Sequence, residues 1–255
     1  MTSAFFMGHS YKEDTVHLVS LVPSSSIRWN KIRAVIFDVD GTLYAQSKLR
    51  TKMLAALARY YAVRPWRLQE VLILQRFRAE REKRHGAAGP DLENAQYTWV
   101  TRDGKPSVEK VRQVVEQWIF REPNQYLSAC TYPGAKSFFA LLRQQGIKIG
   151  IYSDYKAHDK LAAMGLSADL IVSSTDPYIN HFKPAPHGLF YIAESLGLAV
   201  DECLFIGDRP ELDGACARQA GMPYLIVDKQ PYDCFTFYQN LEKELLVNQQ
   251  LTNHE

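Results

Sequence analysis

Residues 33–43 read Arg33-Ala-Val-Ile-Phe37-Asp38-Val39-Asp40-Gly41-Thr42-Leu43. The apolar, uncharged run at 34–37 is typical of a strand that is buried on both faces, as in the centre of a parallel sheet. Two carboxylates, Asp38 and Asp40, follow the strand directly, and a Gly-Thr pair then turns the chain. Both acids are therefore expected at the carboxyl end of a central strand, where open α/β sheets bind their ligands.

Two carboxylates so close together raise each other's proton affinity, so a site built on them must separate their roles. A metal ion can hold one carboxylate ionised while the other carries a proton. Asp38 is then the candidate nucleophile and metal ligand, and Asp40 the candidate acid/base. The alternative is a pair that only caps the turn, since Asp and Gly are ordinary turn residues. The ends of the other strands distinguish these interpretations.

Composition places the chain among soluble globular proteins. Its 255 residues are 46% hydrophobic and 23% charged, which suits one large domain or one domain with an insertion. The formal net charge of +2 gives no reason to expect nucleic acid as a partner. Four cysteines with no CxxC pair indicate a reducing compartment, so we expect a cytoplasmic protein without disulfides.

The sequence contains no apolar stretch near the roughly twenty residues that a membrane span requires. Residues 1–30 lack the basic start and apolar run of a secretory signal, and we treat them as an N-terminal extension without an assigned function. We expect no membrane partner.

The pattern of the remaining chain predicts two kinds of structure. Residues 46–129 have helical periodicity, with a second helix that begins near Pro65 and runs through Leu68, Val71, Leu72, Leu74 and Phe77. From Tyr132 onward strands and helices alternate, and the first four of these helices each end at a glycine. Strands are predicted at 147–152, 169–173, 203–206 and 224–227, and helices at 135–145, 155–164, 186–196, 212–220 and 235–251.

Alternation of this kind predicts an α/β fold, a doubly wound parallel sheet with an inserted α-helical cap. The catalytic core comprises 31–45 and 130–229, the cap 46–129, and the C-terminal helix lies within 230–255. Because the insertion directly follows the first strand, we expect it to cover the carboxyl edge above Asp38 and Asp40.

The insertion is basic. Residues 45–128 hold 16 Lys and Arg against 9 Asp and Glu, a balance of +7, while the rest of the chain has 14 against 19, a balance of −5. One interpretation is a lid that attracts a substrate with a second anionic group. The other, which we favour, is that Arg76–Arg84 is a solvated helix face with i,i+4 pairs such as Glu80 and Arg84.

The other predicted strands also end in polar side chains. Ser153-Asp154 follows one strand, where a hydroxyl and backbone amides suit an anionic oxygen, although Ser153 is equally typical of a helix N-cap. Asp208 and Asp213 follow another, and so many carboxylates imply a bound cation, with oxygen ligands favouring Mg²⁺.

Lys183 precedes Pro184 just ahead of a predicted helix, and it can place an ammonium beside these carboxylates. The alternative is an ordinary solvated lysine. His181 and His187 have no ligand spacing and are predicted to be loop residues rather than metal ligands.

Taken in order, these motifs resemble the haloacid dehalogenase superfamily, with Asp38–Leu43 matching DxDGT[L], Ser153 after an apolar strand, Lys183 before Pro184, and Asp208 with Asp213 as GDxxxxD. The resemblance implies Mg²⁺ held by Asp38, the backbone carbonyl of Asp40 and Asp208, with Asp213 as a ligand or just behind one. It further implies phosphate binding by Thr42, Ser153, Asp154 and Lys183.

Within that superfamily an acid at the position of Asp40 marks the phosphoryl-transfer enzymes. The resemblance therefore implies a phosphatase that acts on a small phosphorylated metabolite through an aspartyl phosphate, as a monomer or homodimer. A sugar phosphomutase would share the same motifs, and a phosphate-binding interaction protein without turnover is an alternative of another class.

Overall fold

A five-stranded parallel sheet forms the centre of the computed structural model, which describes residues 27–252. Its strands are β1 (Ala34–Phe37), β2 (Lys148–Ser153), β3 (Leu170–Ser173), β4 (Cys203–Gly207) and β5 (Tyr224–Ile226), in the order β3-β2-β1-β4-β5. The predicted α/β class with a central first strand is confirmed. Most of the predicted extension 1–30 lies outside the described residues.

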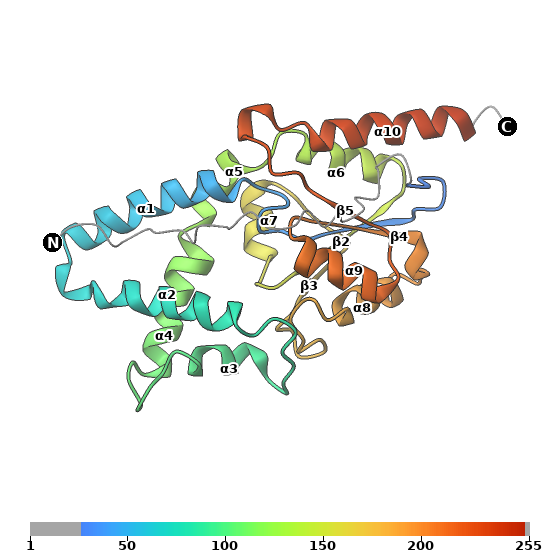
Figure 1. Ribbon diagram of the computed structural model, residues 1–255. Helices are drawn as coiled ribbons and strands as arrows, with labels where there is room; N and C mark the ends of the chain where they lie inside the picture. Colours follow the sequence, from blue (N-terminus) through green and yellow to red (C-terminus); the bar gives the residue numbers. More distant parts are fainter. Residues whose placement is uncertain (1–26, 253–255) are drawn as a thin grey trace, which may run out of the picture.

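Helices cover both faces of the sheet, because alternate residues of β1 point to opposite sides. Val35 and Phe37 belong to a core shared with α6 (Ala135–Gln144), α7 (His158–Met164) and α10 (Phe237–Thr252). Ala34 and Ile36 belong to a second core with α8 (His187–Ser195) and α9 (Ala215–Ala220). Figure 1 shows α6 and α10 on one side of the strands and α8 and α9 on the other. The sheet is therefore doubly wound, as predicted.

The strand register places three strand ends at one edge. Phe37 of β1 pairs with Ile151 of β2 on one side and with Ile206 of β4 on the other, and both pairings are parallel. After β1 the chain adds strands outward through β2 and β3, and it then returns to add β4 and β5 on the opposite side. The order thus reverses beside β1, and ligands of open α/β sheets bind at such a point.

The segment between β1 and β2 is helical. It contains α1 (Gln46–Ala62), the 3₁₀ helix η2 (Pro65–Arg67), α2 (Gln69–Glu82), α3 (Leu92–Thr98), α4 (Val108–Val115), the π-helix η3 (Glu116–Arg121) and α5 (Asn124–Cys130). Its two connections to the sheet run side by side, since the amide of Ala45 donates to the carbonyl of Cys130 at 2.9 Å, and that of Tyr132 to Leu43 at 3.0 Å. Helices α1 to α4 lie to one side of the sheet in Figure 1.

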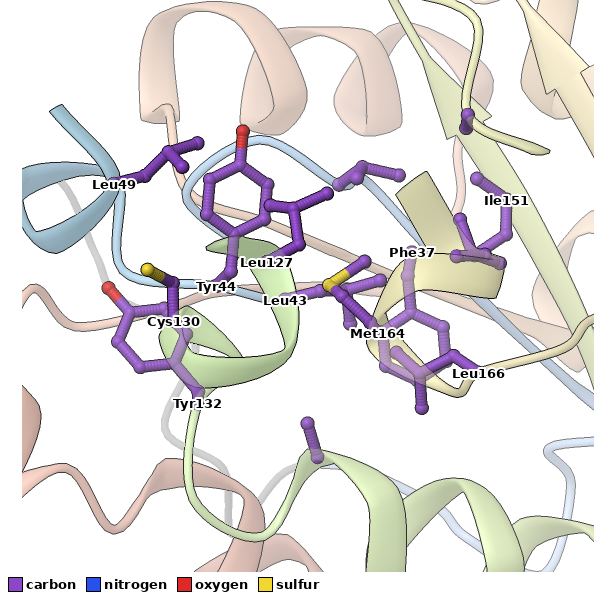
Figure 2. Packing of buried hydrophobic residues seen from close by; sticks show 14 of the residues in the cluster. Phe37, Leu43, Tyr44, Leu49, Leu127, Cys130, Tyr132, Ile151, Met164 and Leu166 are labelled. Atoms are coloured by element: carbon purple, nitrogen blue, oxygen red, sulfur yellow. The ribbon is translucent and has the colours of Figure 1, made fainter. Parts of the chain in front are cut away.

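Apolar packing joins this insertion to the sheet. Figure 2 shows a continuous group of side chains that leads from Phe37 and Ile151 of the sheet through Leu43 and Leu127 to Leu49 of α1. All of these belong to one buried cluster. The entry to the insertion is therefore held in place by the same core that packs against the sheet.

One prediction about the insertion is wrong in detail. The helix predicted to begin near Pro65 is divided into the 3₁₀ helix η2 and α2, which begins only at Gln69. The buried apolar residues of α2 are Ile73, Leu74 and Phe77, whereas Leu68 and Leu72 are 54% and 50% exposed. Helix α5 was not predicted, because its seven residues are too few for a clear period.

The short segments η4 (Val200–Glu202), the π-helix η5 (Pro210–Gly214) and η6 (Tyr232–Cys234) complete the described structure. No helix in residues 27–252 combines the length and the apolar character needed to cross a membrane.

Candidate active site

A buried ammonium lies between two carboxylates at the carboxyl edge of the sheet. Lys183 Nζ is 2.8 Å from Asp38 Oδ1 and 2.8 Å from Asp213 Oδ1, and the residue is only 1% exposed. The interpretation of Lys183 as a solvated lysine is therefore wrong. The loop after β3 delivers it to a strand end more than a hundred residues earlier, as the motif spacing predicts.

Three carboxylates gather around this position. Oxygen atoms of Asp38, Asp208 and Asp213 lie within 4.8 Å of one another. Burial raises the pKa of Asp38 well above its ordinary value, and although Lys183 opposes this, the carboxylates of Asp213, Asp208 and Asp40 add to it. Burial and the charge of Asp213 likewise raise the pKa of Asp208 to about 6, against the opposing charge of Lys229.

This donor set fits a hard divalent cation. It consists of carboxylate oxygens with no Cys or His, so it suits Mg²⁺ rather than zinc. The raised pKa values of Asp38 and Asp208 also indicate a cation site. Carboxylates that repel one another in a buried site are stabilised when a cation binds between them.

Asp213 is already engaged on both oxygens. Its Oδ1 accepts from Lys183, and its Oδ2 accepts from the backbone amides of Asp208 and Arg209 at 3.1 and 3.0 Å. Gly207 makes this close packing feasible, since a Cβ atom there would lie 2.3 Å from the Cβ of Asp213. Asp213 thus holds the strand end that carries Asp208.

Asp40 has a cationic partner that the sequence analysis missed. Lys160 Nζ lies 2.5 and 2.7 Å from the two carboxylate oxygens, and the hydroxyl of Tyr44 also donates to Asp40. Burial acts to raise the pKa of Asp40, but the charge and hydrogen bonds of Lys160 and the hydrogen bond of Tyr44 outweigh it, so the pKa lies below its ordinary value. Lys160 sits in α7, where its pattern resembles that of any charged residue on an amphipathic helix.

The other predicted phosphate-binding residues hold their neighbours. The Thr42 hydroxyl donates to Asp38 Oδ2 at 3.0 Å, so both oxygens of Asp38 have a partner. Ser153 accepts from the amide of Tyr155 at 3.2 Å, and the Asp154 carboxylate accepts from the Ser174 hydroxyl at 2.6 Å. Contact of Thr42, Ser153 and Asp154 with phosphate stays a prediction.

The N-cap interpretation of Ser153 is wrong, because α7 begins only at His158. His181 and His187 stack on each other with ring centroids 3.6 Å apart, and neither belongs to the carboxylate cluster.

The insertion contacts this edge of the sheet directly. Arg209, which follows Asp208, forms an ion pair of 2.7 Å with Glu82 of α2. Backbone hydrogen bonds join the loop after α2 to the loop that carries Lys183, from the amide of Gly86 to Lys183 and from that of Phe182 to Ala87. The insertion therefore contacts the carboxyl edge of the sheet.

Comparison with known proteins agrees with this geometry. The family model described as haloacid dehalogenase-like hydrolase matches residues 32–221. A phosphoglycolate phosphatase of Rhodospirillum rubrum is 30% identical over 108 residues, which cover 41% of this chain and 44% of that protein. A glyceraldehyde 3-phosphate phosphatase of Methanopyrus kandleri is 27% identical over 213 residues, which cover 79% of this chain and 86% of that protein.

Among solved structures, a HAD phosphatase from Thermococcus onnurineus superimposes with a TM-score of 0.51 at 24% identity, covering 79% of this chain and 90% of that one. This likeness concerns the fold. The alignment with the Rhodospirillum protein spans less than half of that relative's length.

Proposed function

The chain belongs to the haloacid dehalogenase-like hydrolases, and from this premise we propose that it is a Mg²⁺-dependent phosphatase that hydrolyses a small phosphorylated metabolite. One observation carries the proposal. Asp38 is held on one oxygen by Lys183 and on the other by Thr42, at an edge of the sheet where Asp208 and Asp213 also lie. A carboxylate oriented in this way beside a cation site is suited to attack phosphorus.

In the first step Asp38 attacks phosphorus in line with the leaving oxygen and forms an aspartyl phosphate. The leaving oxygen takes a proton from the Asp40–Lys160 pair, whose ammonium carries the proton in the described arrangement. In the second step the ionised Asp40 takes a proton from the water that attacks phosphorus. The bond between Asp38 and phosphorus breaks, inorganic phosphate leaves, and the proton taken from water restores the Asp40–Lys160 pair.

Charge neutralisation supports both steps. Lys183 contacts the nucleophile and stays protonated. Burial acts to lower its pKa, but the charges of Asp213 and Asp38 outweigh burial, so the pKa lies well above its ordinary value. Ser153 and the backbone amides beyond β2 would hold the phosphoryl oxygens. Asp38, Asp208 and the backbone carbonyl of Asp40 would hold Mg²⁺, which when bound neutralises charge on the phosphoryl group. Asp213, with both oxygens engaged, acts by orienting Asp208 and Lys183.

We further propose that residues 46–129 act as a cap over a catalytic core formed by 31–45 and 130–229. The contacts of Glu82 and of the loop after α2 with the sheet edge support this division. The core residues contact only phosphate and metal in this scheme, so the choice of substrate rests with the insertion.

Hydrolysis of p-nitrophenyl phosphate by the purified chain, with Mg²⁺ and with EDTA, tests the proposal. We expect Mg²⁺-dependent release of nitrophenol. Phosphate binding without turnover would indicate an interaction protein instead, and turnover that requires a sugar bisphosphate would indicate a phosphomutase.

A further inference from the structure

Arg81 occupies an environment that its sequence context does not predict. It lies in the charged run Arg76–Arg84, for which a solvated helix face is expected, and its neighbours Arg76 and Arg78 are indeed exposed. Arg81 itself is only 7% exposed. It continues the buried face of α2 four residues beyond Phe77, so the packing of that face carries its guanidinium into the contact between the insertion and the sheet.

The guanidinium has neutral partners. Nη1 donates to the side-chain oxygen of Gln96, and Nη2 donates to the backbone carbonyl of Asp154 at 2.5 Å. The rings of Tyr155 and Phe182 lie nearest to it, with centroids 4.1 and 4.5 Å from Cζ, and that of Phe77 lies 5.9 Å away. Within residues 27–252 no carboxylate oxygen lies within 4 Å of its nitrogen atoms to form an ion pair.

The nearby acids are engaged elsewhere. Glu93 reaches Arg81 only through Gln96 and forms its own ion pair of 2.5 Å with Lys156. The Asp154 carboxylate turns toward the hydroxyl of Ser174. By contrast, the buried ammonium groups of Lys160 and Lys183 each contact a carboxylate. A buried charge without a counter-charge is unfavourable, so Arg81 is a position where an anion would be stabilised.

The position of Arg81 relative to the reacting groups indicates which part of a substrate it would contact. The Tyr155 ring that packs against Arg81 also has Lys160 Nζ 5.3 Å from its centroid, and Lys160 contacts Asp40. Arg81 therefore lies one aromatic ring away from the pair that protonates the leaving oxygen. In the proposed reaction this is the side of the leaving group.

We propose that Arg81 binds a carboxylate on the leaving group, so that the substrates are phosphate monoesters of small hydroxy acids. This inference rests on the proposed phosphatase function. A guanidinium has five N–H donors in a planar fork that matches a carboxylate, and two of them account for the hydrogen bonds to Gln96 and Asp154. A single positive charge between two aromatic rings matches one carboxylate charge, whereas a second phosphate would bring about two.

The test compares two substrates that differ at one group, 3-phosphoglycerate and glycerol 3-phosphate, with p-nitrophenyl phosphate as the general phosphatase substrate. For the wild type we expect kcat/KM to be at least about tenfold higher for the carboxylate compound. In Arg81→Gln this ratio should fall to within about threefold of one. Arg76→Gln, an exposed arginine of the same helix, should keep the wild-type ratio.

Each outcome bears on one proposal. If the wild type hydrolyses none of the three compounds, the phosphatase function fails. If it hydrolyses p-nitrophenyl phosphate but shows no preference for 3-phosphoglycerate over glycerol 3-phosphate, the role of Arg81 is overturned while the phosphatase stands. An unchanged ratio in Arg81→Gln also overturns it. If Arg81→Gln does not fold, Arg81→Lys replaces it in the test. This variant keeps the positive charge but loses the planar fork of donors. A kcat/KM ratio in Arg81→Lys equal to that of the wild type would contradict the inference.

Discussion

Lys160 Nζ lies 2.5 Å from Oδ1 and 2.7 Å from Oδ2 of Asp40, although 120 residues separate them in the sequence. Lys160 is only 5% exposed, and the carboxylate belongs to the proposed acid/base. The ion pair therefore stabilises the contact between α7 and the end of β1 as long as Asp40 is ionised, and this stabilisation is lost when Asp40 is protonated.

Replacing Lys160 by Met should destabilise the fold by roughly 1–3 kcal/mol at pH 7, because it leaves the Asp40 charge without its counter-charge. Asp40 has a lowered pKa in the folded state, so the stability from the pair is fully present above the pKa of an unfolded aspartate. It is lost as pH falls through the lower folded pKa. The difference in unfolding free energy between wild type and Lys160→Met, measured by urea titration, should therefore shrink below about pH 4.

Lys148→Met is the matched control, since Lys148 also pairs with an aspartate, Asp169, but is exposed. This variant should change stability by less than about 1 kcal/mol. Equal effects of the two substitutions would contradict a structural role for the Lys160–Asp40 pair.

Changing Asp38 to Asn should reduce turnover of p-nitrophenyl phosphate by about 10³-fold or more, because the amide is not a nucleophile toward phosphorus. The shape of the side chain is kept, so the far-ultraviolet circular dichroism should stay that of the wild type. Asp159→Asn, at an exposed position of α7, should retain activity. Substantial turnover by a folded Asp38→Asn protein would rule out the proposed nucleophile.

Mg²⁺ should stabilise the protein more at pH 7.5 than at pH 5. In the folded protein the pKa of Asp208 is about 6, above that of an unfolded aspartate. In the metal-free protein, the contribution of Asp208 to the free energy of unfolding therefore decreases as pH rises from the unfolded pKa to the folded pKa. A bound cation removes the repulsion between the ionised carboxylates of the site, whereas at low pH protons compete with the cation for these carboxylates. At a Mg²⁺ concentration one hundred times the Kd the gain is about 2.7 kcal/mol, visible as a rise in Tm.

In Asp208→Asn the Mg²⁺-dependent rise in Tm should be much smaller at both pH values. A Tm that responds to Mg²⁺ equally in wild type and Asp208→Asn would place the cation elsewhere.

Replacing Gly207 by Ala should impair both stability and activity. The new Cβ would lie 2.3 Å from the Cβ and 2.6 Å from Oδ2 of Asp213, which is closer than real Cβ atoms approach. Asp213 must then move away from the amides that it holds and from Lys183. We expect a loss of about 1–3 kcal/mol in urea unfolding together with a lower kcat, and an unchanged kcat would show that Asp213 does not orient the site.

Much of the site was predictable because it follows local patterns. Asp38, Ser153 and Asp208 each follow a short apolar strand, and parallel strands bring their carboxyl ends to one edge whatever the helices between them do. Lys183 was predictable through the motif around it. For the same reason the order of strands and helices after Tyr132 agrees with the structure to within a few residues.

Lys160 and Arg81 were not predictable, and the reason is common to both. Each lies on a helix whose charged residues look alike in sequence, and only the rotation of that helix against its neighbours decides which of them is buried. Arg76 and Arg78 are exposed while Arg81 is buried, because Arg81 lies four residues after Phe77 on the face of α2 that packs against its neighbours. The sequence by itself determined the sheet, the strand ends and the residues after them, since these depend on short-range patterns. Only the tertiary structure decided which cations face the site, because that depends on packing between helices that are far apart along the chain.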